Sequence, residues 1–427
     1  MNTLILHPAI RGEQSEAEAV SRLEEAEALA RALPEVQPAG GELTWLVRPN
    51  PATLIGTGKV EEIGARIAAG AIGLVIINGA LSPVQQRNLE REWKAKVLDR
   101  TGLILEIFGE RAETREGVLQ VDLAHLEYQR SRLVRSWTHL SRQRGGAGFM
   151  GGPGERQLES DRRQINEKIT RLRRQLDKVV STRELHRSAR KKVPHPVVAL
   201  VGYTNAGKST LFNTLTQASV TAEDMLFATL DPTMRQIRLP SGRPAILSDT
   251  VGFISDLPTQ LVAAFRATLE EVLEADLIIH VRDIASPETE RQKADVEAVL
   301  GDLGLDESAL ENMLEVLNKI DLLDADGRAA ALNRAERRES VLAASAITGE
   351  GCDALLMAVE ERLYPHRQRL TVTVPHAEGR ATAWLYDHSE VAGREESEEA
   401  TLLTVEMTER EYFQFRKEFP DLAAPPR

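Results

Sequence analysis

The chain has 427 residues, of which 42% are hydrophobic and 28% charged, which excludes a collagen-like or wholly disordered protein and allows about three domains. A net charge of −12, taken as a whole, argues against a nucleic-acid partner, because binding phosphates requires clustered Lys and Arg. The single cysteine, Cys352, excludes an intramolecular disulfide and indicates a reducing compartment. No apolar run approaches the roughly 18 residues of a membrane span, so we expect a cytoplasmic protein with at most peripheral membrane association.

Residues 1–117 predict an N-terminal α/β domain. Four short apolar runs are typical of strands: Thr3–His7, Leu43–Val47, Gly73–Asn78 and Leu103–Phe108. Two segments between them, Gln14–Leu33 and Lys59–Ala69, have helical composition and spacing. Strands that alternate with helices favour a parallel sheet. The Pro- and Gly-punctuated stretch Arg48–Lys59 predicts a turn, because its GTGK lacks the spacing of a phosphate-binding loop.

Residues 118–192 predict an antiparallel helical hairpin. Apolar residues recur every seven positions in two stretches: Leu119, Leu126, Leu133 and Leu140, then Leu158, Ile165, Leu172 and Val179. Narrow apolar seams of this kind pack helices against each other. The joining segment, Gly145–Glu155, has six glycines among eleven residues, so we expect a non-helical loop. Its residues alone leave a flexible linker and a functional loop equally open.

Charge is concentrated in this hairpin. Residues 130–192 hold eighteen Lys and Arg against six Asp and Glu, a local balance of +12, so the rest of the chain carries −24. Most of the excess is arginine, whose planar fork suits phosphate oxygens, and this favours an RNA contact over a merely solvated helix face. Aromatic residues make up only 4% of the chain, so base stacking is not expected to dominate.

A phosphate-binding pattern opens the third predicted domain, residues 193–365. The β-branched run Val197–Val201 predicts a buried strand, and LFNTLT after the pattern predicts a helix. The G-x-x-x-x-G-K-S pattern between them comprises Gly202, Tyr203, Thr204, Asn205, Ala206, Gly207, Lys208, Ser209 and Thr210. In this setting backbone N–H groups surround the phosphates, Lys208 reaches the β- and γ-phosphates, and the Ser209 hydroxyl ligates Mg²⁺.

Two further segments complete the expected γ-phosphate site. The strand Ala245–Ser248 leads into Asp249, Thr250, Val251 and Gly252. The segment before it contains Phe227, Ala228, Thr229, Leu230 and Asp231. Asp249 can hold a magnesium-bound water, and the Gly252 N–H can meet the γ-phosphate. Thr229 is the best candidate to complete the magnesium shell, with Thr233 as its competitor, and we expect Lys208, Thr229 and Gly252 to act in hydrolysis.

The base is expected to be guanine. The strand Leu314–Leu317 leads into Asn318, Lys319, Ile320 and Asp321, and the apolar VLAA leads into Ser345, Ala346 and Ile347. The Asp321 carboxylate can accept hydrogen bonds from guanine N1 and N2, which adenine cannot offer, at a cost to ATP of about 1–3 kcal/mol or more. The backbone at Ser345 and Ala346 fits a contact with guanine O6. Four motifs in this order predict an enzyme that binds GTP and GDP with Mg²⁺ and hydrolyses GTP.

Two positions bear on hydrolysis. Phe253 follows Gly252 where Ras-like enzymes have a glutamine that orients the attacking water, so intrinsic turnover should be slow until another group completes the site. Asn205 can coordinate K⁺ beside the phosphates or can simply form a turn, and the sequence leaves both open. The tail, residues 366–427, predicts a small C-terminal α+β domain, with TVTV and TLLTVEM as strands around an acidic turn, Arg394–Glu399.

The motifs GYTNAGKSTLFNTLT, FATLDPT, DTVGFISDLP and NKID, with GGPGERQLESDRRQI and RPNPATLIGTGKVEEI before them, resemble the HflX family of bacterial GTPases over about residues 45–365. The resemblance implies an α/β domain and a helical hairpin joined to a GTPase domain, binding to the large ribosomal subunit, and splitting or rescue of stalled ribosomes under stress. It also implies that Gly145–Glu155 reaches ribosomal RNA and that a hydrophobic residue replaces the catalytic glutamine. Arg282 and Met234 depart from the family pattern.

The expected protein is therefore a monomeric GTPase that contacts large-subunit rRNA, rather than DNA, through the basic hairpin 130–192. Two alternatives stay open. One is a ribosome-assembly or RNA-chaperone factor timed by GTP, and the other is a signalling GTPase with a protein or membrane effector. A GTPase that binds only protein effectors would not need the basic hairpin.

Overall fold

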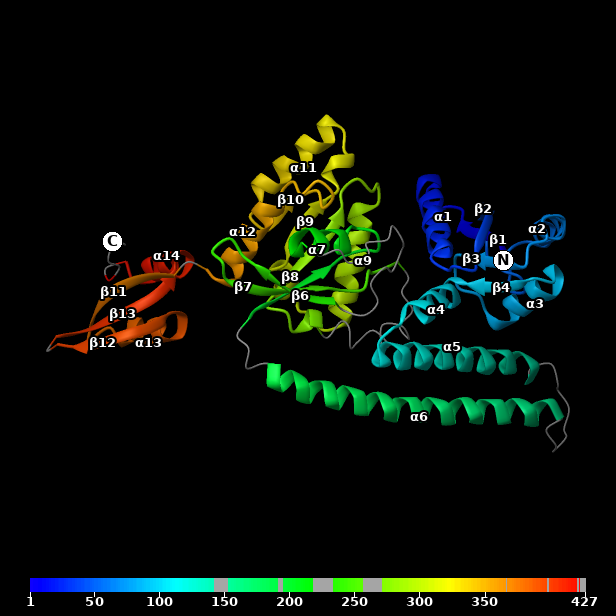
Figure 1. The fold of residues 1–427 in the computed structure, drawn as a ribbon, viewed down its shortest axis with the longest axis horizontal. Helices are drawn as coiled ribbons and strands as arrows, with labels where there is room; N and C mark the ends of the chain where they lie inside the picture. Colours follow the sequence, from blue (N-terminus) through cyan, green and yellow to red (C-terminus); the bar gives the residue numbers. More distant parts are fainter. Residues whose placement is uncertain are drawn as a thin grey trace. The chain divides into compact units, whose positions relative to one another are not determined.

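The computed structural model describes residues 1–141, 153–190, 195–217, 233–255, 271–365, 367–397, 399–420 and 422 (Figure 1). The chain forms two compact units, one of residues Met1–Arg238 with Arg243–Asp353 and one of Leu239–Gly242 with Ala354–Arg427. None of the helices in the described ranges is both long and apolar enough to cross a bilayer.

The first unit begins with a four-stranded parallel sheet in the order β2-β1-β3-β4. Its elements are β1 (Asn2–Ile10), α1 (Glu16–Arg31), β2 (Gln37–Leu46), α2 (Thr57–Ala69), β3 (Leu74–Ile77), α3 (Pro83–Trp93), β4 (Lys96–Asp99) and α4 (Arg100–Arg111). Successive β3 residues point to opposite faces, so Ile76 packs with Leu29 of α1 and Phe108 of α4, while Val75 packs with Trp93 of α3. The sheet is thus covered by helices on both faces, which confirms the predicted α/β class.

The prediction of a strand at Leu103–Phe108 is wrong, because this segment is the buried middle of α4. The strand is the preceding segment, β4, and its last residue starts the helix: the Asp99 side chain accepts a hydrogen bond from the Gly102 N–H at 2.9 Å. Five of the six residues of Leu103–Phe108 are buried and only Glu106 is exposed, so this segment alone is too short to show a helical period. A short apolar run of this kind cannot be told from a strand by periodicity.

The helical hairpin is formed by α5 (Arg115–Ser141) and α6 (Pro153–Arg190), which lie side by side and run in opposite directions (Figure 1). Ile169 of α6 is buried in the seam, and Arg173 donates to Glu127 of α5 at 2.6 Å. Most of the predicted loop lies outside the described residues. Its end, Pro153–Glu155, was expected to be non-helical, but α6 begins at Pro153, because proline suits the first helical position.

A six-stranded sheet follows in the order β10-β9-β8-β5-β7-β6, in which the described strands are parallel except β6. Its strands are β5 (Val197–Val201), β6 (Thr233–Arg238), β7 (Pro244–Asp249), β8 (Leu277–Asp283), β9 (Leu314–Asn318) and β10 (Val341–Ala343). The helical elements are α7 (Lys208–Thr216), α9 (Thr289–Asp302), α10 (Glu307–Glu311), η1 (Ile320–Leu322) and α11 (Ala325–Arg337), and α12 (Cys352–Leu363) continues the chain into the second unit. The predicted motifs follow the carboxyl ends of β5, β7, β9 and β10, where parallel sheets of this class bind ligands.

The second unit contains an antiparallel sheet in the order β11-β13-β12. Its elements are β11 (Arg367–Pro375), α13 (Gly379–His388), β12 (Glu390–Glu396), β13 (Ala400–Thr408) and α14 (Glu409–Glu418). Leu403 and Val405 of β13 pack with Phe415 of α14, and both predicted strands are confirmed. The predicted turn Arg394–Glu399 is too long, because its first three residues continue β12, an edge strand on which charged side chains remain solvated.

Candidate nucleotide-binding site

The loop between β5 and α7 is organised around a buried lysine. Lys208 is only 6% exposed, and its Nζ donates to the carbonyl oxygens of Gly202 at 3.0 Å and Tyr203 at 2.9 Å. An ammonium group has three donors, so one N–H remains for a phosphate oxygen. Burial lowers the pKa of Lys208 to about 8, although the negative charge of Asp249 opposes this. A phosphate group would therefore find a desolvated cation already held inside the loop.

Asn318 connects the phosphate loop to the loop after β10. Its Nδ2 donates to the Ala206 carbonyl at 2.8 Å, and its Oδ1 accepts from the Ala346 N–H at 2.9 Å. Gly207 has a φ of +93°, and a Cβ there would lie 2.2 Å from Asn318 Nδ2, so only glycine fits. The sequence predicts that Asn318 contacts the nucleotide; in the structure its side chain joins the two loops that are expected to enclose it.

The expected magnesium ligands of the described chain lie together. Ser209 Oγ donates to Asp249 Oδ2 at 2.7 Å. A hydroxyl and a carboxylate are the hard oxygen donors that suit Mg²⁺, and the ion usually takes its other ligands from phosphates and water. Thr229, with the rest of Phe227–Asp231, lies outside the described residues.

Gly252 lies directly against the phosphate loop. A Cβ on it would meet Thr204 Cγ2 at 2.8 Å and Lys208 Nζ at 3.1 Å, so the backbone can come this close only as glycine. The next residue, Phe253, donates its N–H to the Gly202 carbonyl at 3.1 Å and accepts from the Thr204 N–H at 2.7 Å. Its ring is buried in the apolar core, which agrees with the expectation that it cannot orient a water molecule.

At the base-recognition end, Asp321 is exposed in η1 and Ser345 is fully buried. Ile347 is 76% exposed, so its apolar side chain is accessible to a planar ring. Three other predicted residues turn their side chains elsewhere: Thr250 donates to the Leu200 carbonyl, Ile320 joins an apolar cluster, and Tyr203 bonds to Glu25.

Four family descriptions match consecutive parts of the chain: "GTP-binding GTPase N-terminal" at residues 20–109, "GTP-binding GTPase Middle Region" at 111–190, "50S ribosome-binding GTPase" at 197–319 and "HflX C-terminal domain" at 330–424. A protein from Magnetococcus marinus named GTPase HflX is 52% identical over 366 residues, which cover 86% of this chain and 83% of that protein. The chain belongs to the HflX family of GTPases.

Two further comparisons agree with membership of the HflX family. GTPase HflX of Escherichia coli K12 is 46% identical over 338 residues, which cover 79% of this chain and 78% of that protein. The crystal structure of a protein called SsGBP with GDP has a TM-score of 0.50 and 25% identity, covering 84% of this chain and 98% of that one. As an HflX-family enzyme with this site, the protein binds GTP and GDP and hydrolyses GTP.

This HflX-family chain also has a buried charge network around Arg282, a residue that departs from the family pattern. Arg282 of β8, which is 3% exposed, bonds to Glu315 of β9 and lies 2.8 Å from Glu290 of α9. Hydrogen bonds from Arg282 and Arg334 lower the pKa of Glu290 to about 2. Lys293 also donates to Glu315, at 2.8 Å. The network fixes β9, whose last residue is Asn318.

Replacing Arg282 with Ala is expected to lower the free energy of unfolding by about 3 kcal/mol, because the buried Glu315 loses its closest partner. Urea denaturation followed by circular dichroism measures the loss. The matched control is Arg31→Ala, which breaks an exposed pair with Glu27 and should cost about 0.5 kcal/mol. Equal losses in the two variants would contradict a structural role for the network.

Proposed function

We propose that this GTPase is a cytoplasmic monomer that binds the large ribosomal subunit in its GTP state and leaves it after hydrolysis, splitting or rescuing stalled ribosomes under stress. The observation that carries the proposal is a row of exposed basic side chains along α6: Arg162, Arg163, Lys168, Arg171, Arg173, Arg174 and Lys178. Such a row in an otherwise acidic chain matches the phosphate backbone of rRNA. The family description "50S ribosome-binding GTPase" supports the same partner.

In the proposed reaction, water attacks the γ-phosphate in line with the leaving GDP oxygen. Lys208 balances the negative charge on the β- and γ-phosphates, and the Gly252 N–H donates to a γ-phosphate oxygen. Ser209 and Asp249 would hold Mg²⁺, which supplies further positive charge at the same oxygens when it is bound. Because Phe253 has no polar side-chain atom, the ribosome or another group must position the water. Loss of phosphate then releases Gly252, which gives the switch its two states.

Sedimentation with purified large subunits tests the proposed partner. We expect the protein to sediment with the subunits in a non-hydrolysable GTP analogue and to stay in the supernatant with GDP. Reversing the charge of Arg171 and Arg174 to Glu should weaken binding by about tenfold or more and reduce its salt dependence. The matched control reverses two exposed arginines of the N-terminal domain, Arg31 and Arg66. No binding at low salt would contradict the ribosomal proposal.

Splitting is separated from the assembly alternative by adding the protein and GTP to intact ribosomes. Accumulation of separate subunits supports splitting. Unchanged ribosomes combined with tight binding to the large subunit alone would favour the assembly or RNA-chaperone factor, in which GTP times release.

Asn205 is proposed to place K⁺ beside the phosphates, where it would supply the charge of an arginine finger. The residue is exposed and has a φ of +59°, which a turn-forming Asn also adopts. We expect GTP turnover in KCl to exceed that in NaCl by about tenfold. Asn205→Gly keeps the left-handed turn and removes the amide, so it should abolish the preference for K⁺. If this variant keeps the preference, or if the wild-type rates are the same in both salts, Asn205 is only a turn residue.

A further inference from the structure

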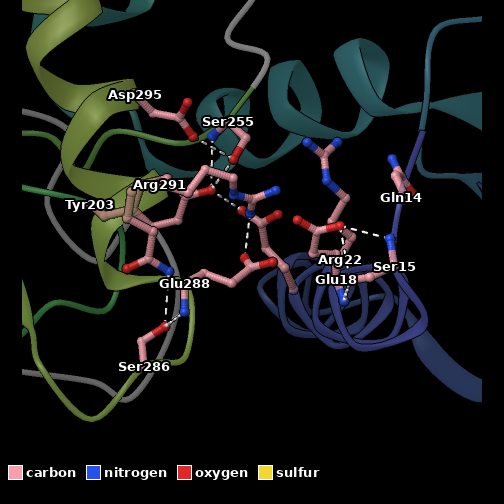
Figure 2. A network of polar contacts seen from close by, with 12 residues as sticks. Gln14, Ser15, Glu18, Arg22, Tyr203, Ser255, Ser286, Glu288, Arg291 and Asp295 are labelled. Carbon is pink, nitrogen blue, oxygen red and sulfur yellow. Dashed lines mark hydrogen bonds and ion pairs between the residues drawn. The ribbon is translucent and has the colours of Figure 1, made fainter. Parts of the chain in front are cut away.

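The second residue of the phosphate loop turns its side chain toward the N-terminal domain. Tyr203 Oη donates to Glu25 Oε1 of α1 at 2.7 Å, accepts from the Ser255 N–H at 2.9 Å and lies 2.6 Å from Ser255 Oγ. Figure 2 shows Tyr203 and Ser255 together beside α1. Burial, followed by the charge of Glu25, raises the pKa of Tyr203, so the hydroxyl stays protonated.

Arg100 bonds the N-terminal domain directly to Ser255. Its Nη2 donates to the Ser255 carbonyl at 3.0 Å and to Glu25 at 3.3 Å, and its Nη1 donates to Asn78 Oδ1 at 2.6 Å. Asn78 follows β3 and is itself fixed, since its Nδ2 donates to the Arg22 carbonyl at 2.8 Å. The guanidinium is therefore held by the N-terminal domain and directed at the backbone of the GTPase domain.

Ser255 is thus bound at each of its polar groups. Tyr203 accepts its N–H, Arg100 donates to its carbonyl, and its Oγ donates to Asp295 of α9 at 3.0 Å (Figure 2). The residue is 4% exposed, and Phe253 and Ile254 before it are buried as well. Only these two residues separate Ser255 from Gly252, the expected donor to the γ-phosphate. We call Glu25, Arg100, Tyr203 and Ser255 the Ser255 clamp.

We propose that Arg100 and Glu25 are positioning residues for GTP: by holding Ser255 they keep Gly252 against the phosphate loop, and so favour the γ-phosphate-bound state over the GDP state. The reasoning is entropic, because a segment that is already fixed has less freedom to lose when its N–H binds a phosphate oxygen. GDP has no γ-phosphate and gains nothing from this. By linkage, GTP must in turn strengthen the contact between Ser255 and the N-terminal domain.

Affinities for GDP and for a non-hydrolysable GTP analogue, measured by fluorescence titration, test the proposal. Arg100→Gln is expected to lower the affinity for the analogue about tenfold and to leave the affinity for GDP within about twofold of the wild-type value. Arg100→Lys keeps the charge but cannot bond to Asn78, Glu25 and Ser255 at the same time. Its affinity for the analogue should therefore lie between those of Arg100→Gln and the wild type. Glu25→Gln is expected to act in the same direction as Arg100→Gln. The control is Arg66→Gln, an exposed arginine of the same domain that pairs with Glu42.

A merely structural role for Arg100 predicts a lower melting temperature with an unchanged ratio of the two affinities, and that result would overturn the proposal. Hydrogen exchange of the wild-type protein is a second test, and its result does not depend on whether a variant folds. The amides at the start of α4 should exchange more slowly with the analogue than with GDP. Equal exchange with the two nucleotides would also overturn it.

Discussion

Lys208→Ala is expected to remove measurable binding of GTP and GDP, a loss of about a hundred- to a thousandfold in affinity. The Nζ lies inside the phosphate loop with one N–H left for a phosphate oxygen, and no other cation is bonded to the same carbonyls in the described residues. Binding of a fluorescent GDP, followed by competition with GTP, measures the loss. Turnover should fall with it.

The folded state should tolerate this substitution. Burial already lowers the pKa of Lys208, which means that the ammonium is disfavoured in the loop without a phosphate partner. The melting temperature of the nucleotide-free variant should therefore equal or exceed that of the wild type. Lys59→Ala, which removes a surface lysine paired with Glu42 and Glu62, serves as the control and should bind normally. Normal turnover in Lys208→Ala would overturn the site assignment.

Asp321→Asn is expected to shift base preference from guanine to xanthine. The affinity for GTP should fall about a hundredfold, and the affinity for XTP should rise by a comparable factor. A carboxylate accepts from two donors on the guanine edge, whereas the Asn amide offers one donor and one acceptor, which suits the xanthine edge. Competition between GTP and XTP for a fluorescent nucleotide gives the ratio.

Asp324→Asn is the matched control for that experiment. Asp324 lies three residues further on and caps α11 by accepting from the Gly327 N–H at 2.8 Å, a role that Asn also fills. Its substitution should leave base preference unchanged. If Asp321→Asn retains the wild-type preference, Asp321 does not read the base.

The parts of the fold and site that the sequence predicted are those set by short-range patterns. The phosphate loop follows a β-branched strand, and Asp249 and Asn318 also end strands, so parallel pairing alone brings them to one edge of the sheet. Heptad spacing likewise located both helices of the hairpin. Each signal lies within one continuous stretch of sequence and depends on backbone geometry.

The parts that could not be predicted depend on contacts between distant residues. Tyr203 meets Glu25 across 178 residues, and Arg100 meets Ser255 across 155, and no local pattern signals either bond. Arg282 is notable in the sequence only as an unusual residue on an apolar strand, and its partners come from two other elements, β9 and α9. The prediction for Leu103–Phe108 is wrong for a different reason, because a short segment in which five of six residues are buried does not show the helical period.

The single amide of Asn318 has a kinetic consequence. The Asn318 side chain bonds both to the Ala206 carbonyl in the phosphate loop and to the Ala346 N–H beside the base. A base that fits poorly beside Ala346 therefore shifts Asn318, and the phosphate loop loses the hydrogen bond at Ala206. Discrimination against ATP is then expressed in the lifetime of the whole complex, and a mismatched nucleotide departs from both ends at once.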